Sequence, residues 1–157
     1  MPNWLKALLI FLIAIIIVVV GVIAYFSTQP SPTPTPSVHT NFIINRQVTV
    51  NHDDYNDYKF NIPSGNVSNI YVLGMFSAEG GSGNDIKVYV FDAYNYGVYK
   101  LNGFYDHLYY SGQVNNASIS ANLTSSGDYY LVLDNLFSPT SSKTVTIQAN
   151  VTYTITS

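Results

Sequence analysis

One short segment concentrates acidic side chains. His52-Asp53-Asp54-Tyr55-Asn56-Asp57 places Asp53, Asp54 and Asp57 within five residues. Carboxylate oxygens are ligands that Ca²⁺ prefers, and aspartates also close turns by accepting hydrogen bonds from nearby backbone amides. The spacing matches no defined calcium loop, so the sequence favours an acidic turn and leaves a structural calcium as the alternative. The remaining calcium ligands would come from Asp85, Asp92 or Asp134.

Tyrosine is concentrated in the middle of the chain. Of 14 tyrosines, seven fall between Tyr89 and Tyr110. A tyrosine ring offers a large apolar face and a polar tip, which suits both sugar stacking and protein contacts. Two interpretations stay open: the rings pack this long connection onto the domain, or some of them form a binding surface. The candidate ligand-binding residues are Tyr94, Tyr96, Tyr99 and Tyr105.

Four Asn-x-Ser/Thr sequons indicate a glycoprotein. Asn122 and Asn150 lie on the polar side of strands in which apolar and polar residues alternate, and Asn116 shares the parity of Asn122. A glycan at these positions would stand outside the core. The predicted acceptors are Asn66, Asn116, Asn122 and Asn150.

Catalytic chemistry is not indicated, and we expect no enzyme and no catalytic residues. The chain has no cysteine, which excludes thiolate nucleophiles and disulfides. Its three histidines, His39, His52 and His107, show no metal-ligand spacing. There is no nucleophile elbow, phosphate loop or dinucleotide fingerprint. Lysine and arginine total 6 against 9 acidic residues, so we expect no nucleic-acid partner.

The elements that must position these residues are strands. Across Thr144–Thr156 apolar residues alternate strictly with polar ones, and the same period recurs at 118–124 and 58–62. Period two predicts strands with one buried and one wet face. The stretches Ile70–Phe76, Ile86–Phe91 and Tyr129–Leu133 are more continuously apolar, which predicts central strands covered on both sides.

Turn sequences separate these runs, and no helical apolar period occurs after the N-terminal segment. Examples are Gly80-Gly81-Ser82-Gly83, Asn102-Gly103 and Ser125-Ser126-Gly127-Asp128. Short strands at this spacing predict an all-β fold, a single jelly-roll-like β-sandwich of about seven or eight strands.

Several motifs resemble known extracytoplasmic domains. Asp54–Gly65 (DYNDYKFNIPSG), Asn84–Ala93 (NDIKVYVFDA) and Gly127–Asn135 (GDYYLVLDN) are similar to the strands of prokaryotic pre-peptidase C-terminal domains. Tyr129–Val145 resembles the last hairpin of the GOLD domains of secretory cargo receptors. The resemblance implies a jelly-roll sandwich and no particular activity, because such folds host many functions.

The first 26 residues predict a membrane helix. Leu8–Phe26 contains neither charge nor amide, and its 19 residues would span about 28 Å, close to the hydrocarbon core of a bilayer. Trp4 and Tyr25 flank the run, and Lys6 favours a cytoplasmic N-terminus. We therefore expect residues 1–7 to be a cytoplasmic tail and 8–26 a transmembrane signal anchor.

Two other interpretations of this segment stay open. Val22-Ile23-Ala24 fits a signal-peptide cleavage site, which would make the domain a secreted sandwich. Lys6-Ala7 before Leu8-Leu9 resembles the leader of archaeal type IV pilins, which implies a filament subunit.

The residues after the helix predict a spacer and one domain. Residues 27–39 are rich in Pro, Ser and Thr and should form an extended linker, and 40–157 should form the extracytoplasmic domain. We expect a single-pass protein of the cell membrane whose cell-surface module binds an envelope protein or glycan. The alternative is a structural filament subunit. Low charge, many hydroxyls and the sequons favour an archaeal source.

Overall fold

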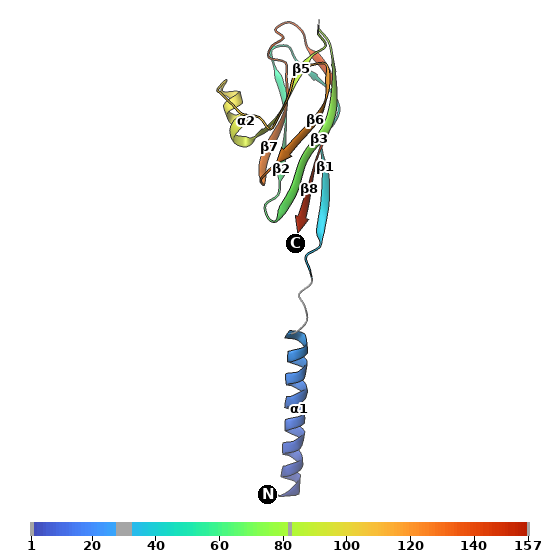
Figure 1. Ribbon diagram of the computed structural model, residues 1–157, viewed down its shortest axis with the longest axis vertical. Coiled ribbons are helices and arrows are strands. Elements are labelled where there is room, and N and C mark those ends of the chain that lie inside the picture. The colour runs from blue at the N-terminus through green and yellow to red at the C-terminus, as the bar shows by residue number, and fades with distance from the viewer. Residues whose placement is uncertain (1, 28–32, 82, 157) are drawn as a thin grey trace. The chain divides into compact units, whose positions relative to one another are not determined.

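The computed structural model describes residues 2–27, 33–81 and 83–156 (Figure 1). The chain divides into two compact units, Met1–Pro34 and Thr35–Ser157. The first unit contains helix α1 (Asn3–Ser27), and the second contains eight strands and the short helix α2 (Ala93–Lys100).

Helix α1 includes the whole predicted membrane segment and begins five residues before it. Its first turn is closed by hydrogen bonds from the backbone amides of Leu5 and Lys6 to the carbonyl oxygen of Pro2, and proline is favoured at helix starts because it needs no amide partner there. At 25 residues the helix is about 37 Å long. It is therefore long and apolar enough to cross a membrane, as an anchor or as a signal sequence.

The second unit is a sandwich of two four-stranded antiparallel sheets. The first sheet has the order β1-β8-β3-β6 and consists of β1 (Pro36–Val50), β8 (Lys143–Thr156), β3 (Val67–Glu79) and β6 (Asn116–Leu123). The second has the order β2-β7-β4-β5 and consists of β2 (Tyr55–Ile62), β7 (Gly127–Asp134), β4 (Ile86–Asp92) and β5 (Tyr109–Val114). This strand order is that of a jelly roll, which confirms the predicted fold class.

The main core lies between the two sheets. Each strand contributes every second residue to it, as the alternating burial along β8 and β6 shows. The fully buried side chains of this core include Val50, Ile62, Val72, Ile86, Val88, Ile119, Leu131 and Leu133.

A second, smaller core lies on the outer side of the β2-β7-β4-β5 sheet. Helix α2 packs there, and Figure 1 shows it beside β7 and β2. Strands β4 and β7 are thus covered on both faces, as their continuously apolar sequences predicted. The buried residues of this aromatic cluster are Tyr89, Phe91, Tyr96, Tyr99 and Val132.

Helix α2 was not predicted from the sequence. Asp92 ends β4 and caps the helix, because its carboxylate accepts hydrogen bonds from the backbone amide and the side chain of Asn95 at 2.8 and 3.0 Å. Tyr96 and Tyr99, three residues apart, then lie on the same side of the helix and face the sheet. The cap and tertiary packing create a helix that has no amphipathic period of its own.

The prediction that Ile70–Phe76 is covered on both sides is wrong. On β3, Ile70, Val72 and Phe76 are buried, but Tyr71, Leu73 and Met75 are 42%, 47% and 65% exposed. The sheet that contains β3 has its core on one side only, so the outward half of this apolar run faces solvent.

Strand β1 begins at Pro36, inside the stretch predicted as linker. Residues 36–39 pair with Tyr153–Thr156 at the end of β8, and proline is tolerated at the first position of an edge strand. Residues 28–32 of the predicted linker lie outside the described residues.

Candidate functional site

The four candidate tyrosines do not form one exposed surface. Tyr96 and Tyr99 are buried, Tyr105 is half-buried beside them, and Tyr94 is 78% exposed. The rings of Tyr99 and Tyr105 meet edge to face at 5.3 Å, and Tyr96 stacks on Tyr130 with centroids 3.9 Å apart. Three of the four rings therefore pack the connection onto the sheet.

The phenol groups of this cluster are held in their protonated form. Burial is the main cause that raises the pKa of both Tyr96 and Tyr99. The hydroxyl of Tyr96 also donates a hydrogen bond to the Asp57 carboxylate at 2.8 Å, which raises its pKa further. A buried, neutral ring cluster with an internal acceptor is a packing device.

The three aspartates of the acidic segment have separate roles. The backbone amide of Asp53 donates to the carbonyl of Ser138, Asp54 accepts from the amide of Tyr55, and Asp57 accepts from Tyr96. Among residues 2–27, 33–81 and 83–156, no group of three or more acidic or histidine side chains could hold a metal ion. The structure does not bring these carboxylates together.

The other acidic residues considered as calcium ligands are engaged elsewhere. Asp85 accepts hydrogen bonds from Gln113 at 2.6 Å and from the buried ammonium of Lys143 at 2.9 Å. These two donors, Gln113 first, hold the pKa of Asp85 below its usual range. Asp92 caps α2, and Asp134 accepts from the backbone amide of Leu136. Each supports a loop or cap at its own position.

Three of the four sequons lie on one surface. Asn116, Asn122 and Asn150 point away from the core on the outer face of the β1-β8-β3-β6 sheet, whereas Asn66 lies in the turn before β3. Asn66, Asn116 and Asn122 are exposed and Asn150 is half-buried.

The strand register defines the rest of this outer face. Directly paired outward residues form four rows that cross all four strands β1, β8, β3 and β6, and beyond the last of these rows Glu79 on β3 pairs with Thr144 on β8. No residue of the four rows is charged, and hydroxyl and amide groups surround a few apolar side chains. The rows are Thr40-Thr152-Tyr71-Asn122, Phe42-Asn150-Leu73-Ser120, Asn45-Gln148-Met75-Ser118 and Gln47-Thr146-Ser77-Asn116.

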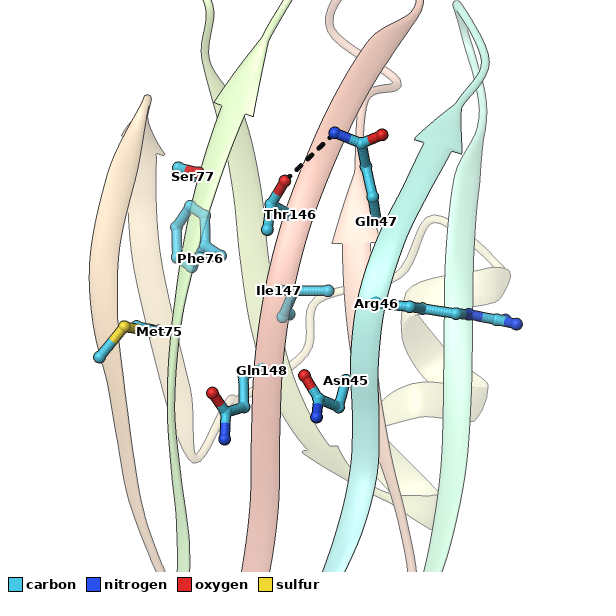
Figure 2. Close-up of a pocket in the computed structure, with 9 residues that line it drawn as sticks. All are labelled: Asn45, Arg46, Gln47, Met75, Phe76, Ser77, Thr146, Ile147 and Gln148. Carbon is cyan, nitrogen blue, oxygen red and sulfur yellow. Dashed lines mark hydrogen bonds between the residues drawn. The ribbon is translucent and has the colours of Figure 1, made fainter.

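An open groove of about 320 Å³ crosses the last two rows. Figure 2 shows the side chains of Asn45, Gln47, Thr146, Gln148 and Met75 projecting from their strands around it. Arg46 also lines the groove, but its side chain extends away from it (Figure 2). The groove thus offers amide donors and acceptors beside one thioether and has no charged group among its outward side chains.

Strands β3 and β8 approach each other closely at Gly74, next to the groove residue Met75. A Cβ atom on Gly74 would lie 2.3 Å from the carbonyl oxygen of Gln148 and 2.8 Å from Cα of Ala149. Only glycine lets β3 and β8 come together at this point. The pair Gly74–Ala149 directly adjoins the groove pair Met75–Gln148 in the strand register.

This surface was not predicted from the sequence, although the alternating polar positions of β8 pointed to it. The polar positions of β8 showed that one face of its sheet is wet. Any strand beside β8 must share that wet face, so outward apolar residues on β3 had to be exposed. The sequence did not show that β3 pairs with β8.

Taken together, the chain is an eight-stranded jelly-roll sandwich preceded by an apolar helix. No protein-family model matches it, and no curated protein matches its sequence. A chain of the disulfide-linked pili that form Bacillus endospore appendages has 11% identity and a TM-score of 0.45, over 82% of this chain and 96% of that one. A chain of infectious bursal disease virus (Gx strain) has 8% identity and a TM-score of 0.39, over 81% and 36%. At this distance neither likeness says what the chain does. The resemblance to pre-peptidase C-terminal and GOLD domains stays a prediction.

Proposed function

We propose that this chain is a membrane-anchored cell-surface module that binds a neighbouring envelope component through the outer face of its β1-β8-β3-β6 sheet. In this proposal α1 stays in the membrane, residues 1–7 are cytoplasmic and the sandwich is extracytoplasmic. The module holds its partner without catalysing a reaction.

The observation that carries the proposal is the composition of the outer face. A solvent-facing strand face is usually polar, and an apolar patch rimmed by polar groups marks an interaction site. Here Met75, which is 65% exposed, stands in the groove among uncharged hydroxyl and amide side chains. A partner that covers the two rows of the groove therefore desolvates hydroxyls and amides and no ion, which lowers the free-energy cost of forming the contact.

The groove supplies specificity in this proposal. Its amides can pair with the hydroxyl or peptide groups of a partner, and Met75 adapts its shape to what it touches. A neutral partner, either an uncharged protein surface or a neutral glycan, fits these groups better than an acidic or basic one.

Site-specific photo-crosslinking tests the proposal in native membranes. A photoreactive residue replaces Gln47 at the groove in the full chain, and a control chain carries it at Ser126, in the exposed turn between β6 and β7. We expect a discrete cross-linked product from position 47 and none from position 126. Adding Met75→Lys in the groove should abolish that product without unfolding the domain, because Met75 is 65% exposed.

Other outcomes separate the alternatives. A product that contains only this chain, in a ladder of increasing size, would favour the filament subunit. A mature chain that starts at Tyr25 would favour secretion, and one that starts at Leu8 would favour the pilin-type leader. Equal cross-linking from positions 47 and 126 would contradict the proposed binding face.

A further inference from the structure

Two sequons adjoin the exposed apolar side chains directly. Asn122 on β6 is the cross-strand partner of Tyr71 on β3. Asn150 on β8 lies between two apolar partners, Leu73 on β3 and Phe42 on β1. Directly paired side chains on one face have Cβ atoms about 4.5–5.5 Å apart. A group attached to either asparagine therefore begins beside an apolar side chain.

The acceptor groups are oriented for modification. Residues two apart on a strand point to the same face, so Asn150 and Thr152 of one sequon both point outward from β8. Thr152 shares a hydroxyl contact of 3.0 Å with Thr40, on the side away from Tyr71. Asn122 is exposed at the edge strand β6. Neither asparagine belongs to the core.

We propose that Asn122 and Asn150 carry N-linked glycans whose first sugars cover an apolar stripe made of Phe42, Tyr71 and Leu73. This inference rests on the extracytoplasmic location proposed above. It divides the outer face in two. Glycans on Asn122 and Asn150 cover the two rows that contain the stripe. The groove in the other two rows stays open for the partner, because Asn116, the third sequon of this face, lies at the β6 end of the last row and does not line the groove.

The chemistry requires a lipid-linked sugar phosphate as donor and a membrane-bound glycosyltransferase. The side-chain Nδ2 of asparagine forms a bond to C1 of the first sugar, and the C1–O bond to the phosphate breaks. The lipid-linked phosphate leaves with the electron pair, and one amide proton is lost to a base. No oxidant or reductant is involved.

The exposed apolar side chains of the stripe are the physical reason for glycans at these positions. Phe42, Tyr71 and Leu73 are 64%, 42% and 47% exposed, and among the described residues no element packs over them. Such a patch on an open sheet face favours aggregation. Glycans are bulky and solubilising, so two of them rooted within the stripe keep that half of the face away from other molecules.

Mass spectrometry of the full chain from its native membranes tests the proposal. We expect the intact mass to exceed the sequence mass, and peptides containing Asn122 and Asn150 to carry the added sugar. Asn122→Gln and Asn150→Gln should each remove the mass of one glycan. The matched control is Asn66→Gln, a predicted acceptor in a turn away from the stripe. It should remove no more than its own glycan and leave the dye binding and the elution volume described below unchanged.

A second measurement tests whether the attached glycans cover the apolar stripe. The double variant Asn122→Gln with Asn150→Gln should bind an apolar-surface dye more strongly and elute as larger species, and adding Tyr71→Ser with Leu73→Ser should reverse both changes. Unmodified asparagines at 122 and 150 would overturn the proposal, and so would glycans whose removal changes neither the dye binding nor the elution volume.

A discrete dimer of the unglycosylated chain that Tyr71→Ser abolishes would instead assign the stripe to self-association. Cross-linking from position 47 is independent of these masses, so failure here is distinguishable from failure of the proposed function.

Discussion

The two sheets of the sandwich differ in what lies over their outer apolar residues. On β4 and β7, Phe91 and Val132 point away from the main core and are fully buried, because α2 packs over them. On β3, Leu73 and Met75 also point away from the core, yet both remain exposed. The long connection between β4 and β5 supplies the cover, and the first sheet has no such connection among the described residues. The chain itself thus covers the apolar outer face of one sheet and leaves that of the other sheet exposed.

The largest expected effect compares an outward residue of the covered sheet with one of the exposed sheet. Phe91→Ala should lower the free energy of unfolding by about 3–5 kcal/mol, because a fully buried ring leaves a cavity. Met75→Ala, on the outer face of the other sheet, should change it by less than about 0.5 kcal/mol. Denaturant unfolding of the full chain in detergent measures both. Equal losses would show that the outer face of β3 is covered within the chain.

Two glycines give the next contrast. Gly74→Ala should destabilise by about 1–3 kcal/mol, because the new Cβ meets the backbone of β8. Gly97→Ala in α2 should stabilise by about 0.8–1 kcal/mol, since nothing lies within 4 Å of the added methyl and alanine favours the helix. Opposite shifts of the melting temperature are the expected result; a tolerated Gly74→Ala would contradict the described approach of β3 and β8.

The Lys143–Asp85 pair predicts an acid-dependent loss of stability. The pKa of Asp85 is lower in the folded state than its ordinary value of 3.8, so its contribution is present above that pH and is lost as the pH falls through the folded pKa. Asp85→Asn, which leaves the buried ammonium of Lys143 without its carboxylate, should cost about 1–3 kcal/mol at neutral pH.

The control for this prediction is a pH series of both proteins. Asp128 also titrates with a lowered pKa beside the exposed Lys59, so the informative quantity is the difference in stability between the wild type and Asp85→Asn. This difference should vanish at pH values below the folded pKa of Asp85. A difference that stays constant with pH would assign the effect to packing.

The smallest effect concerns the cover over the second sheet. Asp92→Ala removes the N-cap of α2 and should cost about 0.5–2 kcal/mol, whereas Asp92→Asn retains an acceptor and should cost little. Faster amide hydrogen exchange in 93–100 of the alanine variant alone is the measurement. Unchanged exchange would show that tyrosine packing holds α2 without its cap.

The parts of the fold that are periodic in sequence were predictable. Strict alternation over Thr144–Thr156 predicted β8 almost to its ends, and the uncharged run at 8–26 predicted the position of α1. Each of these signals lies within one element. They gave the fold class because jelly-roll strands are short, regularly spaced and separated by turn residues.

The candidate site depends on which strands pair and on what packs over each sheet, and neither can be predicted from the pattern within one element. The run Ile70–Phe76 is as apolar as Ile86–Phe91, and only strand pairing decides that the first has a bare outer face and the second a covered one. Helix α2 likewise exists through its cap at Asp92 and its contacts with the sheet. Burial of Tyr96 and Tyr99, and exposure of Tyr71, therefore could not be predicted from residue type or spacing.

Single-cysteine labelling tests the central claim most directly, because the chain has no cysteine of its own. Gln47→Cys at the groove and Ser126→Cys in the turn are treated with a membrane-impermeant maleimide, in intact cells and again after purification in detergent. We predict that position 126 reacts in both samples, which places the domain outside, and that position 47 reacts only after purification, because a partner covers the groove in the envelope. Equally rapid labelling of position 47 in intact cells would contradict a bound partner, and no labelling of either position in intact cells would contradict the extracytoplasmic location.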